Sequence, residues 1–126
     1  MLKTLMLMAL GGSLGAVLRF LTQVTVYELA GRSFPYGTLV VNVFGSFLMG
    51  LLTIILVEKF DLGSEWHMAI LIGVLGSFTT FSTFSIETLV LFEQGDIIKA
   101  MSNIVLSIVL CISSVWAGAY FAKQLV

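Results

Sequence analysis

The sequence is short of charge: only 10% of its 126 residues are Asp, Glu, Lys or Arg. A soluble domain of this length needs a charged surface, so the composition excludes an ordinary water-soluble fold. The single cysteine, Cys111, has no partner in the chain and therefore favours neither a disulfide framework nor a metal site. The formal net charge of −1 excludes a basic surface for nucleic acid, so we expect no nucleic-acid partner.

Long stretches with almost no charge take up nearly the whole chain, although Arg19 interrupts the first of them, and 59% of the residues are hydrophobic. About 20 apolar residues are enough for a helix to cross the hydrocarbon core of a membrane. We therefore predict an all-α integral membrane protein that forms a single four-span transmembrane domain over residues 1–126. The expected helices are approximately residues 4–27, 34–57, 66–92 and 99–123.

The first expected span has a second interpretation, because Lys3 followed by LMLMAL is also typical of a secretory signal peptide. The residues that follow, GGSLGAVLRF, continue with small residues at helical spacing, and three more spans come after them. This continuation favours a first helix that is retained in the membrane.

Positive charge is almost equally divided between the two ends of the predicted helices. One end carries Lys3, Lys59 and Lys123, and the other carries Arg32 and Lys99, with Arg19 added if it reaches that interface. A membrane protein is oriented by a clear excess of Lys and Arg on one side, and this chain lacks one. Either a small bias or another signal decides the orientation, or the chain inserts both ways round. In the second case two opposed copies can pair as an antiparallel homodimer.

Small and polar residues recur along single helix faces, at the spacing at which helices pack closely. They are Gly11 and Gly15 in the first span, Thr38, Asn42, Ser46 and Gly50 in the second, and Asn103, Ser107, Cys111, Ser114 and Gly118 in the fourth. We interpret Gly11, Gly15 and Gly50 as packing seams. The two asparagines are different, because a buried amide must find hydrogen-bond partners.

The stretch GSFTTFSTFS (residues 76–85) lies near the centre of the third span. Glycine, serine and threonine weaken a helix, and their hydroxyl groups can bond to backbone carbonyls and interrupt it. We predict a helix broken in mid-membrane. Its spare carbonyl oxygens can bind a hard cation, and a two-fold axis through this point would bring oxygens from two subunits together.

Phe81 and Phe84 are three residues apart and so share one helix face. An aromatic ring has a positive edge, which can attract an anion. Ser82 and Thr83 add hydroxyl groups, and Asn42 offers amide donors from the second span. Such a set suits an anion, although a pair of phenylalanines at this spacing is also typical of plain packing.

Two charged residues lie within or beside the spans. Arg19 either draws anions into a vestibule or extends to the membrane surface without a role in transport. Glu87 either pairs with Arg19 or carries protons. The motifs of nucleotide binding, metal binding and nucleophilic catalysis are missing from the sequence, so we do not expect an enzyme.

These motifs together resemble the Fluc (CrcB) family of fluoride ion channels, over essentially the whole chain. The resemblance is carried by GGSLGAVLRF (11–20), GTLVVNVFGSFLMG (37–50) and GVLGSFTTFSTFSIE (73–87). It implies a fluoride-selective channel of the bacterial inner membrane that passively exports cytoplasmic fluoride. It also implies an antiparallel homodimer surrounded by lipid, with two separate pores.

The resemblance further implies roles for individual residues. The implied fluoride pore consists of Phe81, Phe84, Asn42, Ser82, Thr83, Thr38, Ser107 and Ser114, with Arg19 and Glu87 as charges near the pathway. Gly76 and Thr79 match the positions whose backbone carbonyls hold a structural sodium ion at the dimer centre.

Two other functions compete with a channel. A proton-coupled, dual-topology exporter of small molecules or ions needs a titrating acid inside its cavity. Here the acid candidates, Glu28 and Glu87, lie at span ends. A membrane assembly subunit without transport activity would tolerate aliphatic residues at Phe81 and Phe84.

Overall fold

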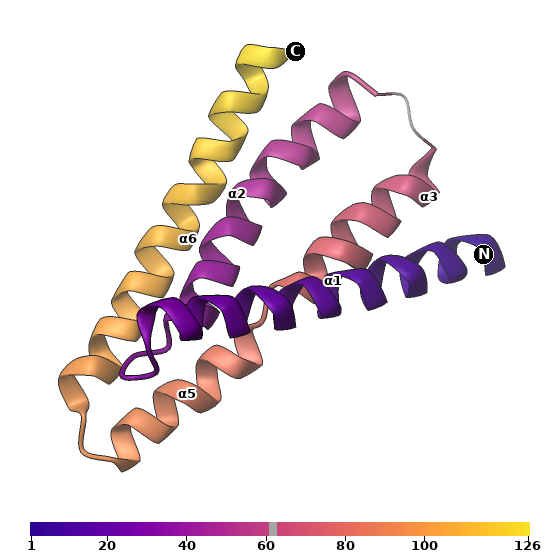
Figure 1. Cartoon of the computed structure of the whole chain (residues 1–126). Coiled ribbons are helices and arrows are strands. Elements are labelled where there is room, and N and C mark those ends of the chain that lie inside the picture. Colours follow the sequence, from indigo (N-terminus) through magenta and orange to yellow (C-terminus); the bar gives the residue numbers. More distant parts are fainter. Residues whose placement is uncertain (61–62) are drawn as a thin grey trace.

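The computed structural model describes residues 1–60 and 63–126, and Figure 1 shows an arrangement of helices connected by short turns. Within these residues the chain is all-helical, as predicted, with no strand. The elements are α1 (Leu2–Ala30), α2 (Tyr36–Glu58), α3 (Ser64–His67), the π-helix η1 (Met68–Leu75), α4 (Gly76–Phe78), α5 (Phe81–Glu93) and α6 (Ile97–Leu125).

Four segments are long and apolar enough to cross a membrane, which confirms the four-span prediction. They are Leu2–Ala30, Tyr36–Glu58, Ser64–Glu93 and Ile97–Leu125. The third span consists of α3, η1, α4 and α5 in succession. Large hydrophobic side chains on these helices point outward, and several buried ones are polar. Such a distribution suits a protein whose solvent is lipid.

Glycine and proline set the ends of the helices. Gly31 and Gly95 have φ angles of 82° and 81°, and they follow the ends of α1 and α5. Glycine adopts this left-handed conformation without a steric penalty, so the chain can turn sharply there. Pro35 directly precedes α2, where its missing N–H group is not needed.

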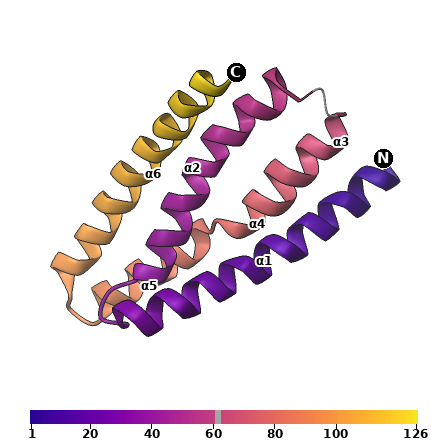
Figure 2. The same ribbon diagram turned by 45° about the horizontal axis from the view of Figure 1, so that its top comes forward.

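Helices α2 and α6 lie side by side, as both Figure 1 and Figure 2 show. Their backbones touch at two glycines. A Cβ atom on Gly50 would collide with the carbonyl oxygen of Val115, and one on Gly118 would collide with that of Phe47. The predicted packing role of Gly50 is therefore confirmed, and Gly118 shares it.

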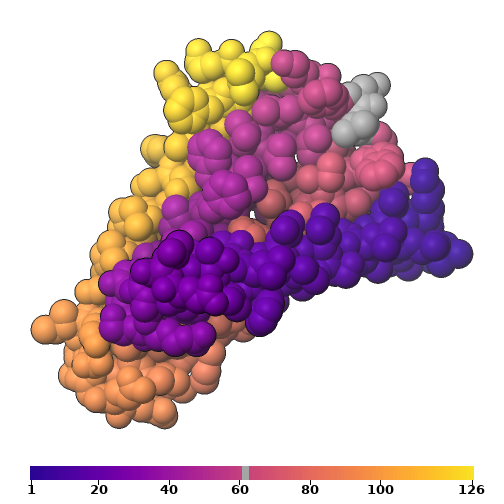
Figure 3. Space-filling model, viewed as in Figure 1, coloured from indigo at the N-terminus to yellow at the C-terminus, as the bar shows by residue number. Residues whose placement is uncertain are grey.

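Helix α1 packs against η1 in the same manner. A Cβ atom on Gly11 would lie 2.5 Å from the carbonyl oxygen of Ala69, and one on Gly15 would collide with the carbonyl of Val74. Both glycines are buried, which confirms their role as a packing seam. The connection between α1 and α2 lies against α5 and the start of α6, shown in purple and orange in Figure 3.

Candidate functional site

The third span is interrupted at Thr79 and Thr80, within the stretch where the sequence predicts a break. Helix α4 ends at Phe78 and α5 begins at Phe81. Thr79 has a ψ angle of 156°, and Thr80 has φ and ψ angles of −151° and 113°. Both residues are thus extended. Non-helical backbone at this depth needs hydrogen-bond partners within the protein.

The side chain of Asn42 supplies two of those partners from α2. Its amide nitrogen donates to the carbonyl oxygen of Thr80 at 3.0 Å, and its oxygen accepts from the Thr80 N–H group at 2.8 Å. The sequence predicts that this amide donates to an anion, whereas much of its capacity is used at the helix break. An amide NH₂ has two hydrogens, so one donor remains after the bond to Thr80.

The hydroxyl group of Thr80 caps the following helix. It accepts from the Thr83 N–H group at 3.1 Å and donates to the Thr83 hydroxyl oxygen at 2.9 Å. A threonine in this position compensates one of the unpaired N–H groups of the first turn. Helix α5 therefore restarts at a defined residue.

These bonds determine which backbone carbonyls lose their helical donors. In a continuous helix the N–H group of Thr80 would donate to the carbonyl of Gly76, and that of Thr83 to the carbonyl of Thr79. Here the two N–H groups donate instead to the side chains of Asn42 and Thr80. Gly76 and Thr79 are the residues that the resemblance associates with sodium. Gly76 is also exposed on the surface of the subunit.

Gly45 makes room for the interrupted segment. A Cβ atom at this position would collide with the methyl group of Thr79 and would lie 3.1 Å from the ring of Phe78. Thr79 can therefore lie against α2 only because residue 45 lacks a side chain.

A groove with a volume of about 370 Å³ runs beside the break, between α2 and α6. It brings together Asn42, Phe81, Phe84 and Ser107, which the sequence analysis assigns to one pathway. The full lining is Asn42, Gly45, Ser46, Met49, Thr79, Thr80, Phe81, Phe84, Ser107, Ile108, Cys111, Ile112 and Val115. These residues include no charged side chain.

The two phenylalanine rings differ strongly in their environments. Phe81 is 79% exposed on the isolated subunit, whereas Phe84 is 9% exposed. Their ring centroids are 5.3 Å apart and their planes are tilted by 49°. The rings therefore do not stack face to face, and at least one positive edge can be turned toward a neighbour.

The other predicted pore hydroxyls lie outside the lining of this groove. Thr38 contacts Glu87, and Ser82 and Thr83 gather around the hydroxyl of Thr80 at the start of α5. Ser114 is partly exposed on α6. The groove thus unites half of the predicted pore residues.

A second series of hydrogen bonds joins α5 to α6 one turn after Phe84. The amide of Asn103 donates to the Thr88 hydroxyl oxygen at 2.9 Å, and this hydroxyl donates to the Phe84 carbonyl at 2.7 Å. The Ser107 hydroxyl reaches the Asn103 oxygen at 3.5 Å. Thr88 is not among the residues predicted from the sequence, although its position four residues after Phe84 is a usable signal.

Glu87, on α5, contacts side chains of α1 and α2. Its Oε1 atom accepts from the Tyr27 hydroxyl at 3.0 Å and from the Thr38 hydroxyl at 2.9 Å. Thr38 in turn accepts from the side-chain amide of Gln23 at 3.1 Å. Across the described parts of the chain, the ion pairs join Lys3 to Glu65 and Lys99 to Asp96. The expected pairing of Glu87 with Arg19 is therefore not formed, because neutral hydroxyl groups occupy the carboxylate.

The chain matches one family along most of its length. The model of the family described as "CrcB-like protein, Camphor Resistance (CrcB)" matches residues 6–119. The relatives that the chain matches include three named fluoride-specific ion channel FluC. The chain is 51% identical to that of Methylococcus capsulatus over 122 residues, 46% identical to that of Shewanella amazonensis over 117, and 44% identical to that of Geobacter sulfurreducens over 124.

The alignments cover nearly all of this chain, namely 97%, 93% and 98% of it. They cover 94% of the Shewanella relative and 100% of the Geobacter relative. The chain spans about half the length of the Methylococcus relative, of which 54% is aligned.

Proposed function

Because the chain belongs to the CrcB-like protein family, we propose that it is a fluoride-selective channel through which cytoplasmic fluoride leaves the cell passively. Its four spans make it a multi-pass protein of the cell membrane. The observation that carries the proposal is the groove in which Asn42, Phe81, Phe84 and Ser107 meet beside the helix break.

The groove offers weak contacts that can replace the hydration of a small anion. The ring edges of Phe81 and Phe84, the free amide hydrogen of Asn42 and the hydroxyl of Ser107 provide positive ends of dipoles. The lining has no fixed positive charge, so an anion is not trapped there. Ser82, Thr83 and Ser114 extend this path as further hydroxyl groups.

The proposal includes an antiparallel homodimer with two pores. The groove is open along one side of the subunit, and Phe81 is largely exposed next to it. A second copy closes the groove and covers this ring. The nearly equal division of Lys and Arg between the two ends of the helices supports insertion in both orientations. Lipid then surrounds the remaining apolar surface.

A structural sodium ion at the dimer centre is part of the same proposal. The carbonyl oxygens of Gly76 and Thr79 have lost their helical donors to the side chains of Asn42 and Thr80. Carbonyl oxygens suit a hard monovalent cation, and two carbonyls from each subunit give four. This donor set supports sodium at the break.

The alternative of a proton-coupled exporter is less well supported. It needs a titrating acid in the substrate cavity, but the lining of the groove contains none. Glu87 lies outside the groove and accepts two hydrogen bonds from Tyr27 and Thr38.

The test is fluoride efflux from liposomes that contain the purified protein, with a potassium ionophore to balance charge. We expect rapid release of fluoride and almost none of chloride. Phe81→Ile and Phe84→Ile should reduce the flux, because aliphatic side chains lack a positive edge, whereas Phe92→Ile on the same helix should not. Wild-type protein that releases no fluoride, or that pumps it against its gradient when a proton gradient is applied, would refute the proposal.

A further inference from the structure

A second cavity, of about 420 Å³, lies at the end of the bundle where α1 joins α2 and α5 joins α6. We call it the mouth cavity. Phe84 lines the groove described above, and Glu87, three residues later on the same helix, lines the mouth cavity. Because residues three apart lie on neighbouring turns of one face, the two spaces follow one another along α5.

Four charged side chains line the mouth cavity: Arg32, Glu87, Asp96 and Lys99. Lys99 and Asp96 compensate each other, with their nitrogen and oxygen 3.1 Å apart. The charges that remain are those of Arg32 and Glu87.

The carboxylate of Glu87 is only half satisfied. Its Oε1 atom accepts from Tyr27 and Thr38, whereas its Oε2 atom is buried and has no hydrogen-bond partner within residues 1–60 and 63–126. A buried carboxylate oxygen without a donor is costly, so this atom is suited to a nearby cation or donor.

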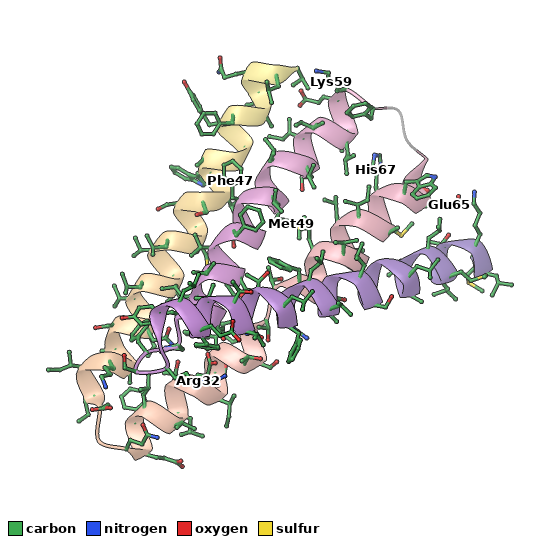
Figure 4. The ribbon with its side chains drawn as sticks, viewed as in Figure 1. Arg32, Phe47, Met49, Lys59, Glu65 and His67 are labelled. Carbon is green, nitrogen blue, oxygen red and sulfur yellow. The ribbon has the colours of Figure 1, made fainter. Side chains whose placement is uncertain are left out.

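Arg32 contacts the same tyrosine as Glu87. Its guanidinium carbon lies 5.1 Å from the centroid of the Tyr27 ring, and the hydroxyl of the same ring is 3.0 Å from Glu87. Figure 4 places Arg32 at the turn between α1 and α2, over α5. The side chain is exposed, and arginine side chains are long and flexible. Arg32 and Glu87 thus contact the same side chain, Tyr27, without forming a direct ion pair within residues 1–60 and 63–126.

An uncompensated carboxylate in this position opposes the passage of an anion. We propose that Arg32, held by Tyr27, neutralises Glu87 at the mouth of the fluoride pathway and thereby sets the rate at which fluoride passes. Arg32 is a positioning residue: it acts on the ion through the charge of Glu87 and not by direct contact. This inference rests on the proposed channel function. A unit charge about 4 Å away in water changes an ion's local concentration roughly fivefold.

The experiment compares fluoride efflux from liposomes that contain wild-type protein, Arg32→Gln, Arg32→Lys, Glu87→Gln and the double variant Arg32→Gln/Glu87→Gln. We expect Arg32→Gln to reduce the efflux roughly fivefold at low ionic strength. The loss should shrink when an impermeant salt is added, because the Debye length falls from about 30 Å at 0.01 M to about 10 Å at 0.1 M. Arg32→Lys should restore most of the rate.

The double variant separates this mechanism from a change in membrane insertion. It has the same number of Lys and Arg residues as Arg32→Gln, and acidic residues contribute little to orientation. If the negative charge of Glu87 slows the ion, the double variant, which lacks that charge, should pass fluoride at a rate close to that of Glu87→Gln alone. Lys123→Gln removes the same charge at the opposite end of α6 from the mouth cavity of its own subunit and should leave the rate within twofold of wild type.

An unchanged rate in Arg32→Gln at low salt would overturn the inference, as would a double variant that is as slow as Arg32→Gln. A wild-type protein that passes no fluoride would refute the channel function itself. The two failures are therefore distinguishable.

Discussion

Replacing Asn42 by alanine should destabilise the folded subunit at the helix break. The substitution removes both hydrogen bonds between this side chain and the backbone of Thr80, which are 3.0 and 2.8 Å long. Thr80 is 6% exposed, so water does not readily replace them. Each buried backbone group left without a partner costs about 1–3 kcal/mol.

Part of this cost can be recovered at the break itself. Once the Thr80 N–H group is released, it can donate to the carbonyl of Gly76 as in a continuous helix. We therefore expect a net loss of about 2–4 kcal/mol in the free energy of unfolding. For a chain of this length, that loss lowers the midpoint of thermal unfolding on the order of 10 °C.

The assay is the fraction of detergent-purified protein that stays monodisperse in size-exclusion chromatography after heating to a series of temperatures. Ser46→Ala is the matched control, because Ser46 lies one turn further along α2 and lines the same groove. It removes a hydroxyl but leaves both bonds between Asn42 and Thr80 in place. If Asn42→Ala and Ser46→Ala melt at the same temperature, Asn42 does not support the break, and our reasoning about the site is wrong.

Three further predictions concern packing, the α5–α6 contact and the break. Gly118→Val should prevent the purified protein from forming a monodisperse species, because the new side chain collides with the Phe47 carbonyl. The control is Gly63→Ala, whose new methyl group meets nothing within 4 Å, and it should behave like wild type in the same chromatography. Asn103→Ala should lower the thermal midpoint through the loss of a buried bond worth about 1–3 kcal/mol, and an equal midpoint in Asn103→Ala and wild type would contradict the contact with Thr88. Replacing sodium by a large organic cation in the efflux assay should reduce fluoride release. The Thr79→Ser variant should show the same dependence on sodium, because the proposed ligand is a backbone carbonyl. Equal rates of release with either cation would argue against the sodium site.

The four spans could be predicted from sequence because each is a long apolar segment with few charges, and a membrane leaves the chain few other choices. The break could be predicted too, since residues 76–85 combine glycine with hydroxyl side chains that weaken a helix. The glycine seams followed from spacing alone. These features depend on residues close together in the sequence, and for that reason they can be predicted from it.

The partners of Glu87 could not be predicted in the same way. Tyr27 and Thr38 are 60 and 49 residues away along the chain, and their contact depends on how α1, α2 and α5 pack. The sequence suggested Arg19 because opposite charges attract, but hydroxyl groups on nearer helix faces occupy the carboxylate. The sequence likewise predicts that Asn42 faces an anion, because its partner on the chain is distant in sequence. In the structure its amide nitrogen and oxygen both bond to the extended backbone of Thr80.

The π-helix η1 was also missed. Its sequence, MAILIGVL, is apolar throughout, so it contains no polar periodicity from which a wider turn could be recognised. Its position opposite Gly11 and Gly15 became visible only with α1 packed against it.

The glycine contacts between α2 and α6 have a consequence for the rigidity of the groove. Main chain meets main chain at Gly50 and Gly118, close to where Met49 and Val115 line the groove. The separation of the two walls is thus fixed by rigid peptide groups, which cannot yield as a side chain does by changing rotamer. The width of the groove beside these contacts therefore changes little with the rotamers of its lining residues.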